Sequence, residues 1–332
     1  DKYNIVESEP NADVKAYMKD MVHRADLVHA GSVNPQDDNM LKICNDGRLL
    51  ATDIRLIDPT RENDPDSKLN KCIDNIYKIY MDTMEKRSVQ AVCCDIGTPS
   101  TDSFNVYDYI KDNLVAKGIP KDEVCFIHDA TTDKKRETML DDLRKGNKRI
   151  IIGSTVKMGT GTNIQNKLIA MHEIDCPWRP SDVEQREGRI LRQLNENDRV
   201  YIFRYVTKGT FDAYNWSIIE KKQGFIGQIM KGNVMSRSCE DIDETKMSYA
   251  EMKAVASGNP LIKERSDVEN ELQRIHSLKN SYNQNRYRLE RNIKSVYPKE
   301  IDRLKKKETL IQKDILIRDS NVLQDDEFQM II

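Results

Sequence analysis

The sequence predicts an α/β fold in which helices cover both faces of a parallel β-sheet. Short apolar runs alternate with longer amphipathic segments between residues 88 and 206. Apolar runs of this kind, such as Ile150-Ile151-Ile152, are typical of strands buried on both faces. Right-handed crossovers would collect the loops that follow the strands at one sheet edge, where such folds bind ligands.

Before the sheet, the first 85 residues are predicted to form a mainly helical segment. Residues 1–10 look like a loose polar lead-in. Apolar residues at helical spacing predict helices over 12–30 and 67–85. Between them, Asn45-Asp46-Gly47 has the composition of a turn.

From residue 88 onward, strands and helices alternate as a parallel sheet requires. The expected strands are 89–94, 124–127, 148–152, 168–174 and 200–206. The expected helices are 104–117, 133–145, 180–192 and 210–230. Gly118 and Gly146 follow the first two of these helices, at the position where glycine commonly ends a helix.

A polar linker and a short helix over 247–255 are expected next. Residues 261–323 are polar and almost entirely of helix-forming types, so they are predicted to be helical. Pro298 separates two apolar seams, which favours an antiparallel helical hairpin, a coiled-coil appendage. The basic residues near the bend indicate either a solvated tip or contact with a DNA backbone. The expected domains are 1–85, 86–240 and 241–332, namely a helical lead-in, the sheet domain and the helical appendage.

The composition limits the classes of partner and compartment. Lys and Arg number 53 against 55 Asp and Glu, a formal net charge of −2, so nucleic acid would need a local basic patch. The seven cysteines have no CxxC or Cys/His spacing, which indicates reduced core thiols and no metal site. No apolar run approaches a membrane span, so we expect a cytoplasmic bacterial protein without membrane contact. The start at Asp1 suggests a fragment or a processed chain.

The stretch from 153 to 192 carries the chemistry. Gly159 and Gly161 let the backbone turn tightly and approach a ligand closely. In the helix that follows, Gln185, Arg189 and Arg192 are spaced four and three apart, so they share one face. A planar, permanently charged guanidinium matches the oxygens of a phosphate group.

This stretch resembles motifs V and VI of superfamily 2 helicases, most closely those of the Snf2-like DNA translocases. Motif V, Ser-Thr followed by Gly-x-Gly-x-Asn-x-Gln, matches Ser154, Thr155, Gly159, Gly161, Asn163 and Gln165. The Asp-x-x-Trp-x-Pro element matches Asp175, Trp178 and Pro180, and Gln-x-x-x-Arg-x-x-Arg matches Gln185, Arg189 and Arg192. The family usually continues Arg-x-Gly-Gln, where this chain has Gln193, Leu194 and Asn195. The phrase from 38 to 56 is similar to one in helicase-like proteins of bacterial mobile elements.

The resemblance implies a RecA-like domain, the second of two motor lobes, with the helix 210–230 bracing it. It implies that Arg189 and Arg192 act as arginine fingers on the γ-phosphate of ATP and that Gln185 orients them. The loop residues that would couple nucleotide to DNA are Gly159, Gly161, Asn163 and Gln165. The residues that would contact DNA phosphates, without sequence specificity, are Thr131, Ser154 and Thr155. The implied partners are DNA and an N-terminal RecA-like lobe of the same parent, which would also hold the Mg²⁺.

The chain lacks the parts of a complete ATPase. It contains no GxxxxGK[ST] phosphate loop, because no Gly-Lys pair occurs anywhere in it. The Asp122-Glu123 pair precedes its strand instead of following one, so we interpret it as surface charge. We therefore expect the chain alone to be inactive.

Two other functions remain open from the sequence. One is a RecA-like platform that binds DNA or protein without catalysis. The other is an unrelated enzyme on a doubly wound sheet, such as a methyltransferase or glycosyltransferase. The second is disfavoured, because no cofactor-binding glycine loop follows the first strand and the five histidines are scattered.

Overall fold

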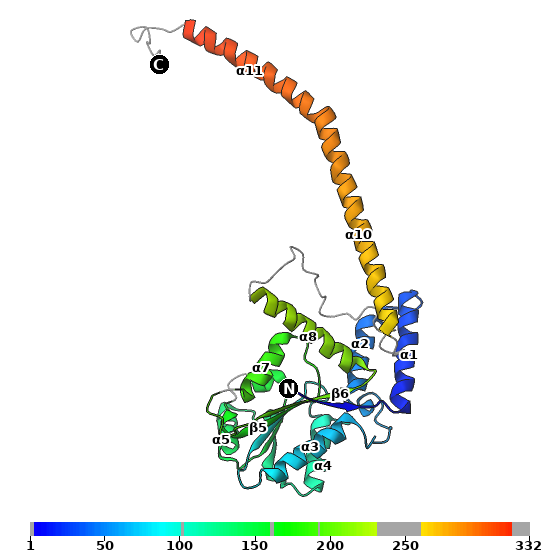
Figure 1. The fold of residues 1–332 in the computed structure, drawn as a ribbon, viewed down its shortest axis with the longest axis vertical. Coiled ribbons are helices and arrows are strands. Elements are labelled where there is room, and N and C mark those ends of the chain that lie inside the picture. The colour runs from blue at the N-terminus through cyan, green and yellow to red at the C-terminus, as the bar shows by residue number, and fades with distance from the viewer. Residues whose placement is uncertain (1–2, 101–102, 160–162, 192, 231–259, 321–332) are drawn as a thin grey trace, which may run out of the picture. The chain divides into compact units, whose positions relative to one another are not determined.

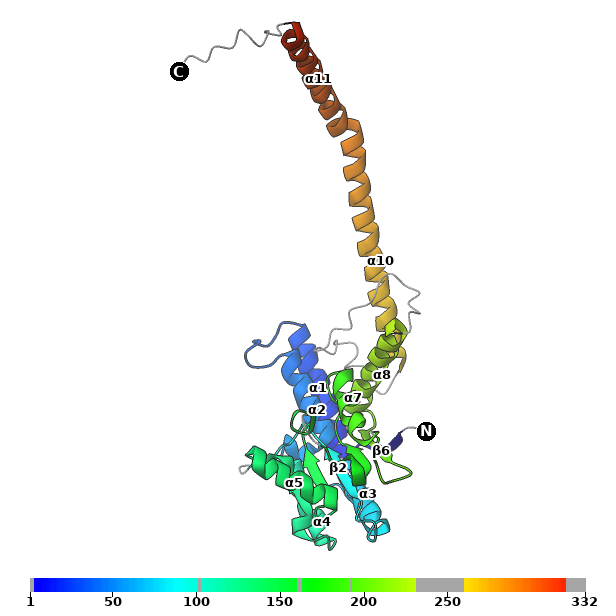
Figure 2. The same ribbon diagram turned by 90° about the vertical axis from the view of Figure 1, so that its left-hand side faces the viewer.

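The computed structural model describes residues 3–100, 103–159, 163–191, 193–230 and 260–320. The chain divides into two compact units, residues 1–263 and 264–332, which we describe separately. The first unit contains the sheet and the helices around it, and the second contains most of a long helix (Figures 1 and 2).

A six-stranded parallel sheet with the order β1-β6-β5-β2-β4-β3 forms the centre of the first unit. The strands are β1 (Asn4–Ser8), β2 (Val89–Cys93), β3 (Val124–Phe126), β4 (Ile150–Gly153), β5 (Leu168–Glu173) and β6 (Tyr201–Thr207). In the middle of the sheet Val92 pairs with Ile152 on one side and with His172 on the other. The parallel sheet predicted from the apolar runs is confirmed, and every residue of β2 and β4 is buried.

The lead-in predicted for residues 1–10 is wrong, because residues 4–8 form β1. This strand pairs in parallel with β6, with Val6 opposite Tyr205. An edge strand is paired along one side only, so its sequence need not be a continuous apolar run. Its first residues are in fact exposed, which removes the periodic signal that marks the inner strands.

Helices cover both faces of the sheet. They are α1 (Ala12–His29), α2 (Met40–Thr52), α3 (Lys68–Asp82), α4 (Val106–Ala116), α5 (Asp133–Lys145), α6 (Thr155–Gly159), α7 (Pro180–Ile190) and α8 (Phe211–Met230). On one face α3 and α4 share a core with Val92 and Ile152. On the other face α5 and the end of α7 share a core with Ala91 and Ile151. A third core joins α1 and α2 to the start of α8.

The turn predicted at Asn45-Asp46-Gly47 is also wrong, since these residues lie inside α2. Gly47 is there for packing. A Cβ atom at this position would lie 2.5 Å from Cε2 of the Phe211 ring, which presses against the helix. The glycine thus lets α2 and α8 approach closely.

The helical hairpin predicted after residue 260 is not formed. Instead, α10 (Pro260–Arg291) runs through a π-helical turn, η5 (Asn292–Val296), directly into α11 (Tyr297–Ser320) (Figure 1). Pro298 lies in the first turn of α11, where its missing N–H is tolerated. Just before Pro298, the backbone hydrogen-bond pattern changes to that of a π turn, in which the Tyr297 amide donates to the Asn292 carbonyl five residues back. The helix predicted over 247–255 lies outside the described residues, and the three-domain division remains a prediction.

Two expectations about single residue types can be compared with the structure. The six described cysteines are buried thiols, as expected, and none of these six forms a disulfide. The surface-charge interpretation is wrong for Glu123, which is 8% exposed. Its carboxylate accepts from the Tyr80 hydroxyl at 2.8 Å and pairs with Arg87 at 2.7 Å.

In the described part of the chain, no helix is both long and apolar enough to cross a membrane.

A buried histidine joins three strands of the sheet. His172 on β5 lies between Gln90 on β2, 3.0 Å from Nε2, and Tyr205 on β6, 2.9 Å from Nδ1. Since the Gln90 amide nitrogen donates to the Ile76 carbonyl, its oxygen faces the ring and Nε2 carries the proton. Burial lowers the pKa of His172 to about 3, so the ring is neutral.

This depressed pKa predicts that stability falls as the pH falls below the ordinary histidine value of 6.5. The unfolded chain then binds a proton that the folded chain rejects, which costs about 2 kcal/mol between pH 7.5 and 5. In urea unfolding at both pH values, His172→Gln should show a smaller loss of stability than the wild type by this amount. His276→Gln, at an exposed position, should keep the full loss. Equal pH dependence in all three proteins would contradict this role.

Candidate functional site

The loops after three neighbouring strands meet at the carboxyl edge of the sheet. Asp95 follows β2, Thr155 follows β4 and Asp175 follows β5. Because β4, β2 and β5 are adjacent and parallel, these residues converge although they lie far apart in the sequence. The edge is the one at which we expect an α/β fold to bind its ligand.

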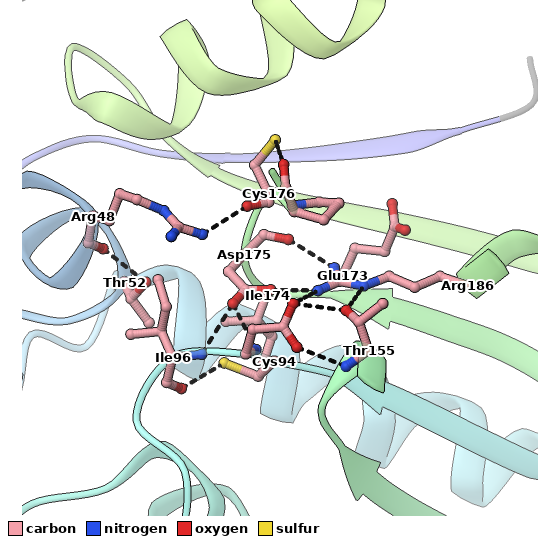
Figure 3. A network of polar contacts seen from close by, with 12 residues as sticks. Arg48, Thr52, Cys94, Ile96, Thr155, Glu173, Ile174, Asp175, Cys176 and Arg186 are labelled. Carbon is pink, nitrogen blue, oxygen red and sulfur yellow. Dashed lines mark hydrogen bonds and ion pairs between the residues drawn. The ribbon is translucent and has the colours of Figure 1, made fainter. Parts of the chain in front are cut away.

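Arg186 on α7 ties the three loops together (Figure 3). Its guanidinium is 3% exposed and donates to the Thr155 hydroxyl at 2.7 Å. It also donates to the Asp95 carboxylate at 2.8 Å, to the Asp175 carboxylate at 2.9 Å and to the Asp175 carbonyl at 2.9 Å. Two carboxylates and one guanidinium thus form a buried ionic cluster at the strand ends.

The carboxylates in turn bind the backbone of the loops. Asp95 accepts from the amide and the hydroxyl of Thr155, at 2.6 and 2.7 Å. Asp175 accepts from the amides of Asp95 and Ile96, at 2.6 and 3.1 Å. The loop geometry therefore depends on both acids being ionised, since a protonated carboxyl group has fewer acceptor sites.

Electrostatics keep the cluster charged in spite of its burial. Burial opposes the charged form of Arg186, but Asp175 and Asp95 outweigh it and hold the pKa of the guanidinium well above its usual value. Burial likewise opposes ionisation of Asp95, and Arg186 and Thr155 together lower the pKa of that carboxyl. Removing the arginine would leave two poorly solvated negative charges.

A second buried arginine, Arg204, binds Glu187, the residue of α7 that follows Arg186. Arg204 on β6 donates to Glu173 at 3.0 Å and to Glu187 at 2.9 Å. Its guanidinium lies 3.5 Å from the ring centre of Tyr3 and 4.1 Å from that of Trp216. With Arg186 and Glu187 both fixed to the sheet, the rotation of α7 about its axis is set.

The side of α7 next to Arg186 presents the arginine and the glutamine that the sequence singled out. Gln185 is exposed and Arg189 is half-buried. The Arg189 guanidinium donates to the carbonyl of Gly159, and a Cβ on Gly159 would lie 2.9 Å from the Gln185 side-chain oxygen. These residues line one small cavity together with Thr155 and Arg186. Gly161 and Arg192 lie outside the described residues.

The other residues named from the sequence are placed separately. Thr131 is exposed before α5, and Ser154 is half-buried. Thr155 is 6% exposed, and its hydroxyl is used by Asp95 and Arg186. Asn163 is exposed, with its carbonyl accepting from Arg144 at 2.8 Å, and Gln165 begins a 3₁₀ turn. Thr131, Asn163 and Gln165 are not among the residues that line the cavity.

The sequence analysis overlooked Arg186, Asp95, Glu187 and Arg204. The available signal was helical spacing, since Arg186 and Glu187 lie between the buried Val183 and Ile190 on the inward side of α7. Charged side chains at inward positions of a helix need buried partners. Acids placed directly after strands, as Asp95 and Asp175 are, could have been proposed as those partners.

The departure from the family pattern after α7 has a structural counterpart. Leu194 has φ of +70°, in the left-handed region that glycine adopts at low cost. This is the position at which the Snf2-like pattern has glycine. The neighbouring Asn195 fixes the loop by donating from its side chain to the Leu168 carbonyl at 2.8 Å.

The ionic cluster leads to a prediction about stability. Arg186→Ala should lower the free energy of unfolding by about 3–5 kcal/mol, because it leaves Asp175 buried without its countercharge and removes the ion pair with Asp95. Urea unfolding followed by circular dichroism measures the change. Arg179→Ala, at an exposed arginine beside the start of the same helix, should cost at most about 0.5 kcal/mol. A similarly small cost for Arg186→Ala would show that the cluster does not hold the loops.

Parts of the chain are similar to known proteins. The family model described as the helicase conserved C-terminal domain matches residues 89–194. Defense against restriction protein B of Escherichia phage P1 is 29% identical over 117 residues, 34% of this chain and 5% of that protein. The chain thus spans about one twentieth of this relative's length.

Among solved structures, the C-terminal part of the Fun30 ATPase domain has a similar fold. The TM-score is 0.51 at 13% identity, covering 80% of this chain and 97% of that one. Residues 89–194 thus match the helicase conserved C-terminal domain, and the chain has a RecA-like α/β fold.

Proposed function

We propose that the chain is the second motor lobe of an ATP-dependent DNA helicase or translocase. The observation that carries this proposal is the position of Arg189 and Gln185 beside Gly159, at the carboxyl edge of the sheet. A motor of this kind closes two lobes on a nucleotide, and the second lobe supplies cationic groups. The helicase family match over residues 89–194 supports the same assignment.

The residues present suit part of an ATP site. Arg189 and Gln185 offer hydrogen-bond donors to phosphate oxygens, and Arg192 follows one turn later in the sequence. Among the described residues, no cluster of three or more His, Cys, Asp or Glu is placed to hold a metal ion. In the proposal, an N-terminal lobe of the parent protein therefore supplies the phosphate loop and the ligands of Mg²⁺.

The arginines would act on charge that develops during phosphoryl transfer. A guanidinium near the γ-phosphate stabilises the transition state more than the ground state, and this is the contribution of an arginine finger. Arg186 and Glu187 would fix α7 so that Arg189 needs little reorganisation when the lobes close. Gln185 would orient Arg189 from the same face of the helix.

The bond from Arg189 to Gly159 suggests how this glycine responds to the nucleotide. In the proposal, Arg189 would leave the Gly159 carbonyl for a phosphate oxygen of the nucleotide when the lobes close, and would return to it once phosphate has been released. Gly159 would thus be bound or released according to the state of the nucleotide.

DNA would be held through its backbone near the same sheet edge. Thr131 and Ser154 have accessible surface there. A hollow beside Thr131 is lined by three lysines and two aspartates, Lys134, Lys135, Lys148, Asp129 and Asp142, so its lining carries a small excess of positive charge. In this scheme Thr155 acts indirectly, because its hydroxyl is used within the ionic cluster.

Two ATPase measurements test the proposal. The chain alone should hydrolyse no ATP above background, because it has no phosphate loop. In the full-length parent, Arg189→Ala or Arg192→Ala should lower the DNA-stimulated rate by roughly 10³-fold or more. Arg179→Ala, beside the start of the same helix and outside the cavity, should leave the rate nearly unchanged.

Near-normal rates in both finger variants would contradict the motor role. So would a parent protein without ATPase activity that still binds DNA, which would favour a non-catalytic platform.

A further inference from the structure

The long helix of the second unit carries an uncovered apolar stripe. The elements α10, η5 and α11 contain 32, 5 and 24 residues, so the helix is about 90 Å long. The stripe consists of Val268, Leu272, Ile275, Tyr282, Leu289, Ile293, Ile301, Leu304, Ile311 and Ile315. Each of these side chains is at least 42% exposed.

The spacing of the stripe is that of a coiled-coil seam. Its positions alternate in steps of four and three from Val268 to Ile293 when Lys279 and Arg286 are included. They do so again from Ile301 to Ile315 when Glu308 is included. Such a seam, two positions in seven, fits a facing helix.

The π turn keeps the two halves of the seam on one face. From Ile293 to Ile301 the step is eight residues, one more than a heptad. One extra residue in a regular α-helix would rotate the second half by about 100°. In η5 the Tyr297 amide bonds five residues back to Asn292, so the turn holds one additional residue. The helix is therefore built to present a single continuous seam.

We propose that two copies of this chain form an antiparallel coiled coil through this seam. A partner for the stretch of the seam from Lys279 to Ile315 must be helical over about 55 Å. Apart from α10 and α11, the longest helix that the structure describes is α8, with 20 residues or about 30 Å. Within the described chain, only the same helix in a second copy has the required length and spacing. The inference does not depend on the proposed motor function.

Charges inside the seam select the antiparallel arrangement. Lys279 and Arg286 lie in the first half of the seam and Glu308 in the second. A parallel pair in register would place each of them opposite itself, which is unfavourable. An antiparallel pair centred near Tyr297 places Arg286 beside Glu308 of the second copy and pairs the seam residues from Lys279 to Ile315 with one another. Arg286 also lies 3.4 Å from Glu290 on its own helix, an exposed pair that leaves it accessible.

The mass of the full 332-residue chain in solution tests the proposal. Light scattering after gel filtration should give twice the chain mass of 38.5 kDa at micromolar concentration. Leu304→Glu should raise the Kd of the dimer about tenfold or more, because it places a charge in the seam. Leu310→Glu, at an exposed leucine of α11 outside the seam, should not.

A charge exchange tests the direction of the pair. Arg286→Glu should weaken the dimer, and the double variant Arg286→Glu with Glu308→Arg should restore it. Circular dichroism confirms in each case that helix content is kept. A monomeric mass at all concentrations, or a dimer equally insensitive to Leu304→Glu and Leu310→Glu, would overturn the proposal. If the dimer of the double variant has a higher Kd than the dimer of Arg286→Glu, the antiparallel arrangement is overturned.

Discussion

The buried guanidinium of Arg186 is the contact on which the geometry of the candidate site depends. It joins Asp95, Thr155 and Asp175, which follow three different strands. The parallel sheet brings these residues to one edge but does not fix the conformation of the loops after them. Hydrogen bonds from the loop amides to the two carboxylates do so, and the guanidinium makes burial of the Asp175 carboxylate tolerable.

This constraint also positions the rest of α7. Arg186 and Glu187 face the sheet and form internal ion pairs, so they anchor the helix. Gln185 and Arg189 lie beside Arg186, around the cavity next to Gly159. The two anchoring residues therefore set where Gln185 and Arg189 lie relative to Gly159.

The sheet could be predicted because its inner strands must be apolar on both faces, and runs such as Ile150-Ile151-Ile152 satisfy that requirement. The edge strand β1 could not, because half of its backbone and side chains face away from the core. The turn at Gly47 was predicted wrongly because glycine is required both in tight turns and where a side chain such as Phe211 packs closely against a helix. The hairpin was wrong because Pro298 can end a helix or lie in its first turn, and the π turn before it decides between the two.

For the site, helical spacing and the family resemblance singled out Gln185, Arg189 and Gly159, and in the structure these three residues line one cavity. Their roles in catalysis remain predictions. The anchoring residues were missed because ion pairs between positions as distant as Asp95 and Arg186 leave no local pattern in a single sequence. The same limit applies to Glu123, whose partners Tyr80 and Arg87 precede it by several dozen positions.

A structure of the full-length parent protein bound to a non-hydrolysable ATP analogue, Mg²⁺ and DNA would test the central claim most directly. The account predicts that Arg186 keeps its bonds to Asp95 and Asp175, while Arg189 leaves the Gly159 carbonyl and lies within hydrogen-bond distance of the γ-phosphate. A nucleotide bound far from α7, or one beside α7 with Arg189 still on Gly159, would contradict it.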